Sequence, residues 1–255
     1  MTMARIHSIE TMGLVDGPGV RVVVFMQGCK LRCAYCHNPD TWGLKGGQDI
    51  SAEELLNKIK RYKPYFKASG GGITLSGGDP LLQPEFVSEL FKMCKEEGIH
   101  TALDTAGYGF GEYDEILKYT DLVLLDIKHI DETEHKKLTG KGRNGFLEFL
   151  DAVKRNRTKL WIRHVVVPGI TDSDEHIRRV AEYINTIPNV EKVELLPYHT
   201  YGEDKYKALN LPYRLEGIPP LSRGRLEELN NILNSVLRLN KRSNTASSVR
   251  SLEVV

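Results

Sequence analysis

The chain has 255 residues, which is enough for one large domain with a sizeable hydrophobic core. Its formal net charge of +1 gives no general attraction to nucleic acid or to anionic membranes, and no apolar run approaches the roughly 20 residues of a membrane span. With 40% hydrophobic and 27% charged residues and no recognisable signal peptide, the sequence predicts a soluble, cytoplasmic protein.

Short apolar, β-branched runs alternate with amphipathic stretches along most of the chain. Several of these runs are continuously apolar, as is typical of parallel strands that are covered on both faces. The predicted strands are residues 21–27, 72–76, 100–104, 122–128, 159–167 and 192–197.

Helical patterns fill the intervals between these runs. Ser51 and Glu54 form a capping box at the start of the first pattern. The predicted helices are residues 51–65, 84–97, 113–119, 132–138, 146–157, 174–186 and 223–239. Six strand–helix units are fewer than the eight of a complete barrel, so we predict an α/β fold, a partial TIM-like (β/α)6 barrel with parallel strands. We expect a single domain over residues 1–240 and a disordered polar tail over 241–255.

Three cysteines, Cys29, Cys33 and Cys36, follow the first predicted strand with the spacing CxxxCxxC. Three thiolates at this spacing can hold three corners of an iron–sulfur cluster and leave the fourth iron open to an exogenous ligand. Structural zinc normally has four ligands in two short pairs, and the remaining cysteine, Cys94, lies in a predicted helix where we expect it to be buried. Four cysteines in a chain of this length also make a poor disulfide framework. A redox cluster is therefore favoured over zinc, and both are favoured over disulfides.

Polar residues gather where the predicted strands end, and parallel α/β folds bind their ligands at this edge. Gly77 and Gly78 expose backbone to a ligand, and Asp79 is suited to accept hydrogen bonds from an ammonium group. Donors for a carboxylate or for ribose hydroxyls are Lys128, Arg163 and His199. Amine, carboxylate and sugar together describe an amino acid joined to a nucleoside. Asp104, Thr105 and Asp126 end two further strands, so the cluster at the C-terminal rim would share its site with this ligand.

These motifs resemble a known family. CxxxCxxC followed by Gly77-Gly78-Asp79-Pro80 resembles the radical S-adenosylmethionine (SAM) superfamily, with residues 12–21, 27–29 and 35–40 resembling its glycyl-radical-enzyme activating family. Residues 161–169 and 195–199 are similar to the pyruvate formate-lyase type of activase, and the resemblance extends over residues 5–240. No cysteine lies between Cys36 and Gly77, whereas many other activases carry a cysteine-rich insert there.

The resemblance implies an activity and its cofactors. It implies a [4Fe–4S] cluster on the three cysteines, and SAM bound at the open iron as cosubstrate. Reduction of the cluster would cleave SAM to methionine and a 5′-deoxyadenosyl radical, which abstracts hydrogen from a glycine of the partner enzyme. The implied partners are the glycine loop of pyruvate formate-lyase and an electron donor of the flavodoxin or ferredoxin type, with the chain itself a monomer.

The residues and the resemblance together assign roles to particular positions. Asp16 is expected to help receive the glycine loop as a catalytic residue, and a monovalent cation is expected near Asp104 and Asp126. Asp79 stands where the family often has the longer glutamate. The expected cofactor-binding residues are Tyr35, Cys36, His37, Gly77, Gly78, Asp79, Asp104, Asp126, Ile127, Lys128, Arg163 and His199.

Other residues receive weaker predictions. Lys30 and Arg32, between the cysteines, either tune the cluster potential or guide an acidic electron donor, or they are simply solvated. His129 and His164 are expected at the surface, and both tryptophans, Trp42 and Trp161, are expected to be packing residues. Two other functions stay open: activation of a different glycyl radical enzyme, and a non-catalytic zinc or iron–sulfur binding module.

Overall fold

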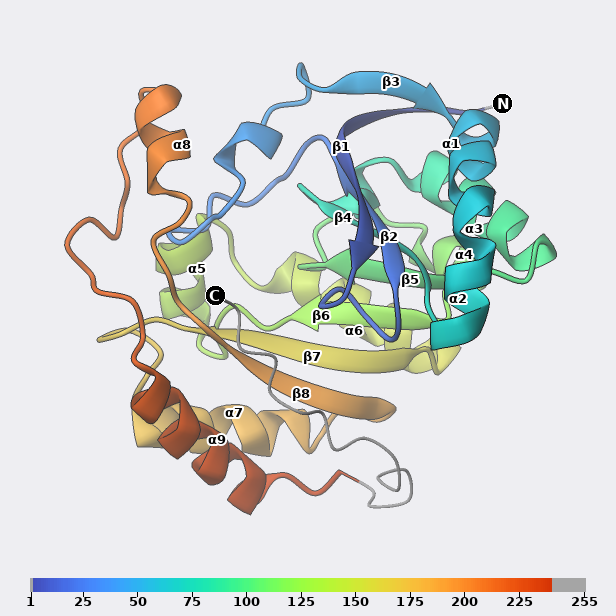
Figure 1. The fold of residues 1–255 in the computed structure, drawn as a ribbon. Coiled ribbons are helices and arrows are strands. Elements are labelled where there is room, and N and C mark those ends of the chain that lie inside the picture. The colour runs from blue at the N-terminus through green and yellow to red at the C-terminus, as the bar shows by residue number, and fades with distance from the viewer. Residues whose placement is uncertain (1, 240–255) are drawn as a thin grey trace.

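The computed structural model describes residues 2–239 and is built around an eight-stranded sheet in the order β3-β1-β2-β4-β5-β6-β7-β8 (Figure 1). The strands that run parallel are β2 (Arg21–Met26), β4 (Gly72–Gly77), β5 (His100–Thr105), β6 (Leu122–Asp126), β7 (Lys159–Val166) and β8 (Val190–Pro197). These correspond to the six predicted strands. Because β3 and β8 lie at the two edges, the sheet is an open, partial barrel.

Two further strands were not predicted from the sequence. β1 (Met3–Gly13) pairs antiparallel with β2, and β3 (Gln48–Ser51) pairs antiparallel with β1. They extend the sheet beyond the first parallel strand, and the six parallel strands follow one another in chain order. The predicted tail over residues 241–255 lies outside the described residues.

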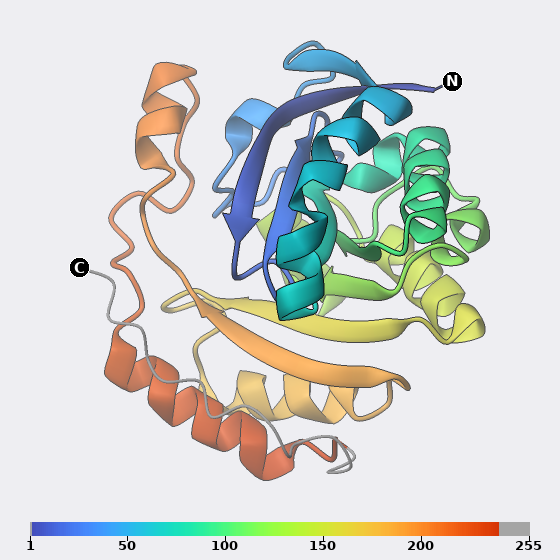
Figure 2. The ribbon, with the colours of Figure 1, turned by 45° about the vertical axis from the view of Figure 1, so that its right-hand side comes forward.

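Helices follow the parallel strands and cover the outer side of the curved sheet (Figure 2). They are α1 (Ala52–Ile59), α2 (Lys63–Ser69), α3 (Pro84–Glu96), α4 (Tyr113–Leu117), α5 (Glu132–Thr139), α6 (Asn144–Asn156), α7 (Asp174–Ile184) and α9 (Arg223–Val236). A further helix, α8 (Glu203–Ala208), stands away from the sheet and contacts residues 39–41 (Figure 1). Three short 3-10 helices are η1 (Pro39–Thr41), η2 (Lys60–Tyr62) and η3 (Pro80–Leu82). The predicted first helix is thus divided into α1, η2 and α2, and α8 was not predicted. Among the helices over residues 2–239, none is long and apolar enough to span a bilayer.

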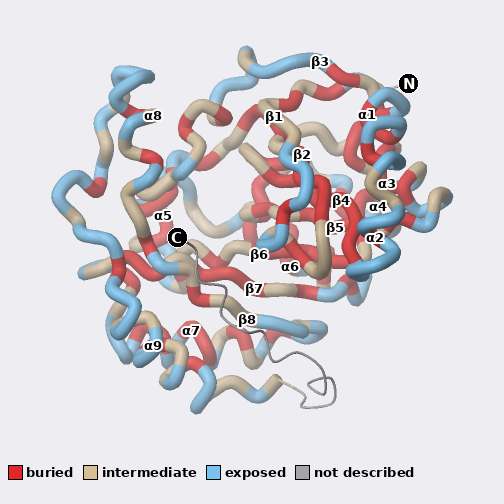
Figure 3. The backbone as a smooth tube through the Cα atoms, viewed as in Figure 1, coloured by how far each residue is buried: buried red, intermediate tan, exposed pale blue. Residues whose placement is uncertain are grey.

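The core lies between the sheet and these helices (Figure 3). Strand residues such as Val24 and Leu103 are fully buried against helix residues such as Phe86 and Phe149. Burial of each large apolar side chain contributes roughly 1.5–3 kcal/mol. A second apolar cluster fixes α7 and α9 to β8. The packed helix layer holds the strands in register, so their carboxyl ends meet at one edge of the sheet.

Candidate active site

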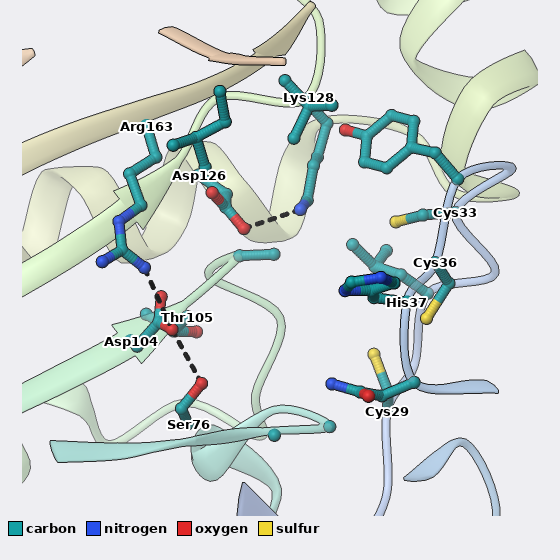
Figure 4. Close-up of a pocket in the computed structure, with 18 of the residues that line it drawn as sticks. Cys29, Cys33, Cys36, His37, Ser76, Asp104, Thr105, Asp126, Lys128 and Arg163 are labelled. Carbon is teal, nitrogen blue, oxygen red and sulfur yellow. Dashed lines mark hydrogen bonds and ion pairs between the residues drawn. The ribbon is translucent and has the colours of Figure 1, made fainter. Parts of the chain in front are cut away.

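A pocket of about 330 Å³ opens at the carboxyl ends of the parallel strands. Figure 4 shows the cysteine loop on one side of it and the polar strand ends on the other. The pocket is lined by most of the predicted site residues: Asp16, Cys29, Cys33, Tyr35, Cys36, His37, Gly77, Gly78, Asp104, Asp126, Lys128, Arg163 and His199. The pocket therefore lies where the sequence predicts a ligand, at the carboxyl ends of the parallel strands.

Backbone hydrogen bonds hold the cysteine loop from both sides. The Gly28 N–H donates to the Thr41 carbonyl at 2.8 Å, next to η1. On the other side, the Arg32 N–H donates to the Thr139 carbonyl at 2.7 Å, and the Ala34 N–H donates to the Leu138 carbonyl at 2.8 Å. Both of these acceptors belong to α5. The loop is thus fixed between two elements that are distant in sequence.

The three thiols of the loop are a suitable donor set for a metal cluster. All three side chains line the pocket, and burial raises the pKa of each, that of Cys33 to about 11. A buried thiolate is costly unless it coordinates a metal. The fourth cysteine, Cys94, is fully buried in α3 as predicted.

The glycine pair at the end of β4 is required by the close approach of β2. Gly77 has a φ of +100°, a conformation that favours glycine. A Cβ atom on Gly78 would lie 2.1 Å from the Gly28 carbonyl oxygen. The Gly78 N–H donates to the Met26 carbonyl at 2.9 Å, and the Asp79 N–H donates to the Gly28 carbonyl at 2.8 Å. These glycines therefore join the second strand end to the start of the cysteine loop.

Two predicted cofactor contacts do not line the pocket. The Asp79 side chain is 1% exposed, and its carboxylate accepts hydrogen bonds from the Thr105 hydroxyl at 2.6 Å and from the Leu81 N–H at 3.1 Å. Burial raises the pKa of Asp79 to about 6 although the Thr105 hydrogen bond opposes the shift. The Ile127 side chain lies in the hydrophobic core. The expected contact between the Asp79 carboxylate and an ammonium group is therefore wrong for this arrangement, because the carboxylate caps η3 instead.

Two ion pairs form the polar wall opposite the cysteines (Figure 4). Lys128 Nζ lies 2.6 Å from an Asp126 carboxylate oxygen, and Arg163 Nη1 lies 3.4 Å from Asp104 Oδ2. Burial lowers the pKa of Lys128, but the Asp126 charge and further neighbours outweigh it and hold this pKa well above its usual value. Burial raises the pKa of Asp104 to about 6 against the opposing charge of Arg163. Carboxylates and fixed cations thus alternate along this wall.

Three pocket residues have buried polar atoms without a hydrogen-bond partner among the described residues. They are Tyr35 Oη, Arg163 Nε and His199 Nδ1, and of these Arg163 Nε lies 3.6 Å from a Glu194 carboxylate oxygen. The His199 ring is next to the rings of His37 and Tyr201, with centroid distances of 4.1 and 4.6 Å. Buried polar atoms are almost always hydrogen-bonded in proteins. A ligand with an aromatic base and hydroxyl groups would satisfy Tyr35 Oη and His199 Nδ1, as expected for a nucleoside.

The two histidines expected at the surface are buried, so that prediction was wrong. His129 is 6% exposed and His164 is fully buried. His164 Nδ1 lies 2.7 Å from the Ile127 carbonyl oxygen, and its Nε2 lies 3.1 Å from His176 Nε2. These rings pack between the end of β6 and α7, outside the pocket. Trp161 is a packing residue as expected, against Ala102, Leu122 and Leu124.

Two residues contact the cysteine loop in a way that the sequence did not indicate. The Trp42 indole N–H donates to Cys36 Sγ at 3.2 Å, and the Tyr206 hydroxyl donates to the Cys36 carbonyl at 3.1 Å. Tyr206 lies on α8, and no motif spacing connects it with Cys36. Trp42 was predicted as a packing residue only, because an indole next to a cysteine motif has no distinctive spacing.

A parallel-sheet enzyme with three pocket thiols is the class that this fold and site define, and comparisons with known proteins give the family. The model of the radical SAM superfamily matches residues 23–181. A curated "Pyruvate formate-lyase-activating enzyme" from Clostridium pasteurianum is 61% identical over 93% of this chain and 100% of its own length. One from Staphylococcus epidermidis is 49% identical over 86% of this chain and 91% of its own length.

A solved domain of the pyruvate-formate lyase-activating enzyme from Bacteroides vulgatus is 28% identical, with a TM-score of 0.53, and the match covers 65% of this chain and 94% of that domain. The chain belongs to the radical SAM superfamily and, within it, to the family of pyruvate formate-lyase-activating enzymes. Membership of this superfamily implies a [4Fe–4S] cluster and SAM as cofactors, in agreement with the donor set of the pocket.

Proposed function

We propose that this protein activates pyruvate formate-lyase by installing a glycyl radical on it. The observation that carries the proposal is a single pocket that brings three cysteine thiols opposite the polar ends of the parallel strands. The curated relatives that share up to 61% of the sequence over most of the chain carry the name of this activity. When bound, the cluster and SAM supply the electron and the 5′-deoxyadenosyl radical that removes a glycine hydrogen.

In this proposal the residues of the pocket bind and orient SAM. Cys29, Cys33 and Cys36 hold the cluster. The polar wall, with Asp126 and Lys128, receives the methionyl end of SAM, because it offers both charges within 3 Å of each other. The methionyl amine would meet the backbone at Gly77 and Gly78, which line the pocket. Tyr35, His37 and His199 receive the adenosine, since all three carry rings, and Tyr35 Oη and His199 Nδ1 have no hydrogen-bond partner among the described residues.

Asp16 is proposed to receive the glycine loop of the partner. It lines the pocket from the loop between β1 and β2, and its carbonyl accepts a hydrogen bond from the Thr74 hydroxyl at 2.6 Å. Beside it, Leu14 and Val15 are 64% and 78% exposed. Exposed apolar side chains next to a pocket are suited to contact another protein. Burial raises the pKa of Asp16, so its carboxyl is also suited to hydrogen-bond a backbone segment.

A monovalent cation is proposed near Asp104 and Asp126, because both carboxylate residues line the pocket. We propose an acidic donor of the flavodoxin or ferredoxin type as the source of the electron, because the basic residues Lys30 and Arg32 lie between Cys29 and Cys33. Arg32 is exposed, and Lys30 Nζ lies 3.9 Å from the centre of the Phe110 ring. A monomer in the cytoplasm is the proposed working form, since the cluster requires a reducing compartment.

Anaerobic reconstitution with iron and sulfide tests the activity. We expect about four irons per chain, 5′-deoxyadenosine after reduction with added SAM, and a glycyl radical signal in electron paramagnetic resonance when pyruvate formate-lyase is present. A protein with stoichiometric zinc and no 5′-deoxyadenosine would be a non-catalytic binding module. A glycyl radical on a different partner, with none on pyruvate formate-lyase, would make this chain the activase of another glycyl radical enzyme.

A further inference from the structure

Trp42 lies directly behind the cysteine loop and is tied to it through its backbone. It follows η1, and its N–H donates to the Pro39 carbonyl at 3.2 Å. Its own carbonyl accepts a hydrogen bond from the Cys29 N–H at 3.2 Å. The position of Trp42 is therefore fixed relative to the first of the three cysteines.

The indole of Trp42 reaches another cysteine of the same set. Its Nε1–H donates to Cys36 Sγ at 3.2 Å. An indole nitrogen can only donate, so the direction of this hydrogen bond is certain. This hydrogen bond also lowers the pKa of Cys36, although burial, the larger effect, raises it. One residue thus contacts two of the three thiol-bearing residues, one through its backbone and one through its side chain.

The indole ring is held in place by two neighbouring side chains. The guanidinium of Arg32 lies 5.0 Å from the ring centre, and the Tyr206 ring meets it edge-on at 5.8 Å. Both neighbours are themselves attached to the cysteine loop. The Arg32 guanidinium donates to the Cys29 carbonyl at 2.8 Å, and the Tyr206 hydroxyl donates to the Cys36 carbonyl at 3.1 Å. The donor is therefore pre-organised and does not need to reorient when the charge on the sulfur changes.

A hydrogen bond to a ligating sulfur stabilises negative charge on it. The reduced cluster carries one more electron than the oxidised cluster, so its sulfur atoms benefit more from the donor. We propose that Trp42 is a positioning residue that raises the reduction potential of the cluster through Cys36 and so eases its reduction by a low-potential donor. The inference rests on the proposed cluster site, but it concerns a property that is measured without any glycyl radical enzyme.

Trp42→Phe removes the indole N–H and keeps an aromatic ring between Arg32 and Tyr206. In the reconstituted full-length protein we expect the midpoint potential to shift to a lower value, with iron content and SAM affinity unchanged. An anaerobic redox titration monitored by electron paramagnetic resonance measures the shift. The matched control is Trp161→Phe, because Trp161 packs on β7 beside Lys192 and away from the cysteines. An unchanged potential in a fully loaded Trp42→Phe protein, or an equal shift in the control, overturns the proposal.

A second measurement detects the hydrogen bond itself and decides the question if Trp42→Phe does not load iron. The chain has two tryptophans, so the Trp161→Phe protein contains Trp42 alone. With indole-¹⁵N tryptophan in this variant, electron–nuclear double resonance of the reduced cluster is expected to show coupling to the ¹⁵N nucleus and to a proton that exchanges in D2O. No coupling would overturn the proposal. Failure of 5′-deoxyadenosine formation in the wild type would instead count against the proposed function.

Discussion

Asp126 and Lys128 are two pocket residues at the end of one strand, and they form an ion pair with each other. Asp126 ends β6, and Lys128 follows two residues later, so both side chains project to the same side. Their side chains are only 22% and 12% exposed and are paired at 2.6 Å. Neither residue is one of the three thiol ligands proposed for the cluster. Their expected role is therefore to hold SAM and not to hold the cluster.

Asp126→Ala tests whether Asp126 contributes to SAM binding and not to cluster binding. We expect the affinity for SAM to fall at least tenfold, which corresponds to about 1.4 kcal/mol, because Lys128 loses its partner and the wall loses a carboxylate. Iron content is expected to stay at the wild-type level. Equilibrium binding of SAM and iron analysis on the same reconstituted sample measure the two effects. Asp126→Asn, which keeps the size and a hydrogen-bonding oxygen, serves as the control for shape. A loss of iron in step with the loss of affinity would contradict the assignment and give Asp126 a structural role.

At the level of elements, the parallel strands were predictable and the antiparallel ones were not. β2 and β6 are continuous apolar runs, and a strand that is buried on both faces leaves this pattern in the sequence. β1 mixes charged and polar residues with apolar ones and is only partly buried, so its pairing with β2 depends on tertiary contacts that no local pattern records. The position of the pocket was also predictable, because recognisable strands have recognisable ends. The Trp42 and Tyr206 contacts to Cys36 did not follow, because they join segments with no shared spacing.

The junction of β2 with β4 gives a prediction at this scale. In Gly78→Ala the new Cβ would lie 2.1 Å from the Gly28 carbonyl oxygen, which is backbone and cannot rotate away. We expect the strand ends to separate, with a loss of about 1–3 kcal/mol in the free energy of unfolding and a lower iron content, since Gly28 leads into the cysteine loop. Urea unfolding and iron analysis measure both.

Gly98→Ala is the matched control for this variant. Gly98 has a φ of +67°, and no atom lies within 4 Å of the place that the alanine methyl group would take. The Gly98→Ala variant is therefore destabilised only by the backbone penalty of about 1–2 kcal/mol for alanine in this conformation. Gly98 follows α3 and lies in no part of the pocket. We expect its iron content to equal that of the wild type. Equal iron content in Gly78→Ala and Gly98→Ala would show that the strand junction does not position the cysteines.

On the scale of the whole molecule, a buried group of histidines links the active-site side of the sheet to the outer helix layer. His164 on β7 contacts the Ile127 carbonyl after β6, and His176 on α7 contacts His164. The His129 ring packs on His176 with a centroid distance of 4.6 Å. Burial lowers the pKa of His164 to about 4 and that of His176 to about 3, against ordinary values near 6.5. Asp126, Lys128, Asp131, Glu134 and Arg179 are the charged groups around the three rings.

These shifts fix the sign of a pH effect on folding. Between about pH 6.5 and pH 4 the unfolded chain binds protons at these histidines while the folded chain does not, so they reduce the free energy of unfolding as the pH falls. Each histidine contributes at most about 1.4 kcal/mol per pH unit in this range, and the contribution to stability is fully present above pH 6.5. Asp79 and Asp104 have the opposite effect over part of the range, because burial raises their pKa to about 6. The contributions of Asp79 and Asp104 to the pH dependence cancel when the wild type is compared with a histidine variant, whereas a single pH profile contains them.

His176→Gln provides this comparison. The glutamine amide occupies the place of the ring nitrogen and is able to donate to His164 Nε2, but it takes up no proton. Relative to the wild type, we expect the variant to gain about 1–2 kcal/mol in the free energy of unfolding when the pH is lowered from 7.5 to 5. Urea unfolding of both proteins under anaerobic conditions at the two pH values measures the gain. A stability difference that is the same at both pH values would mean that His176 is protonated in the folded chain, and that this residue does not make the fold sensitive to acid.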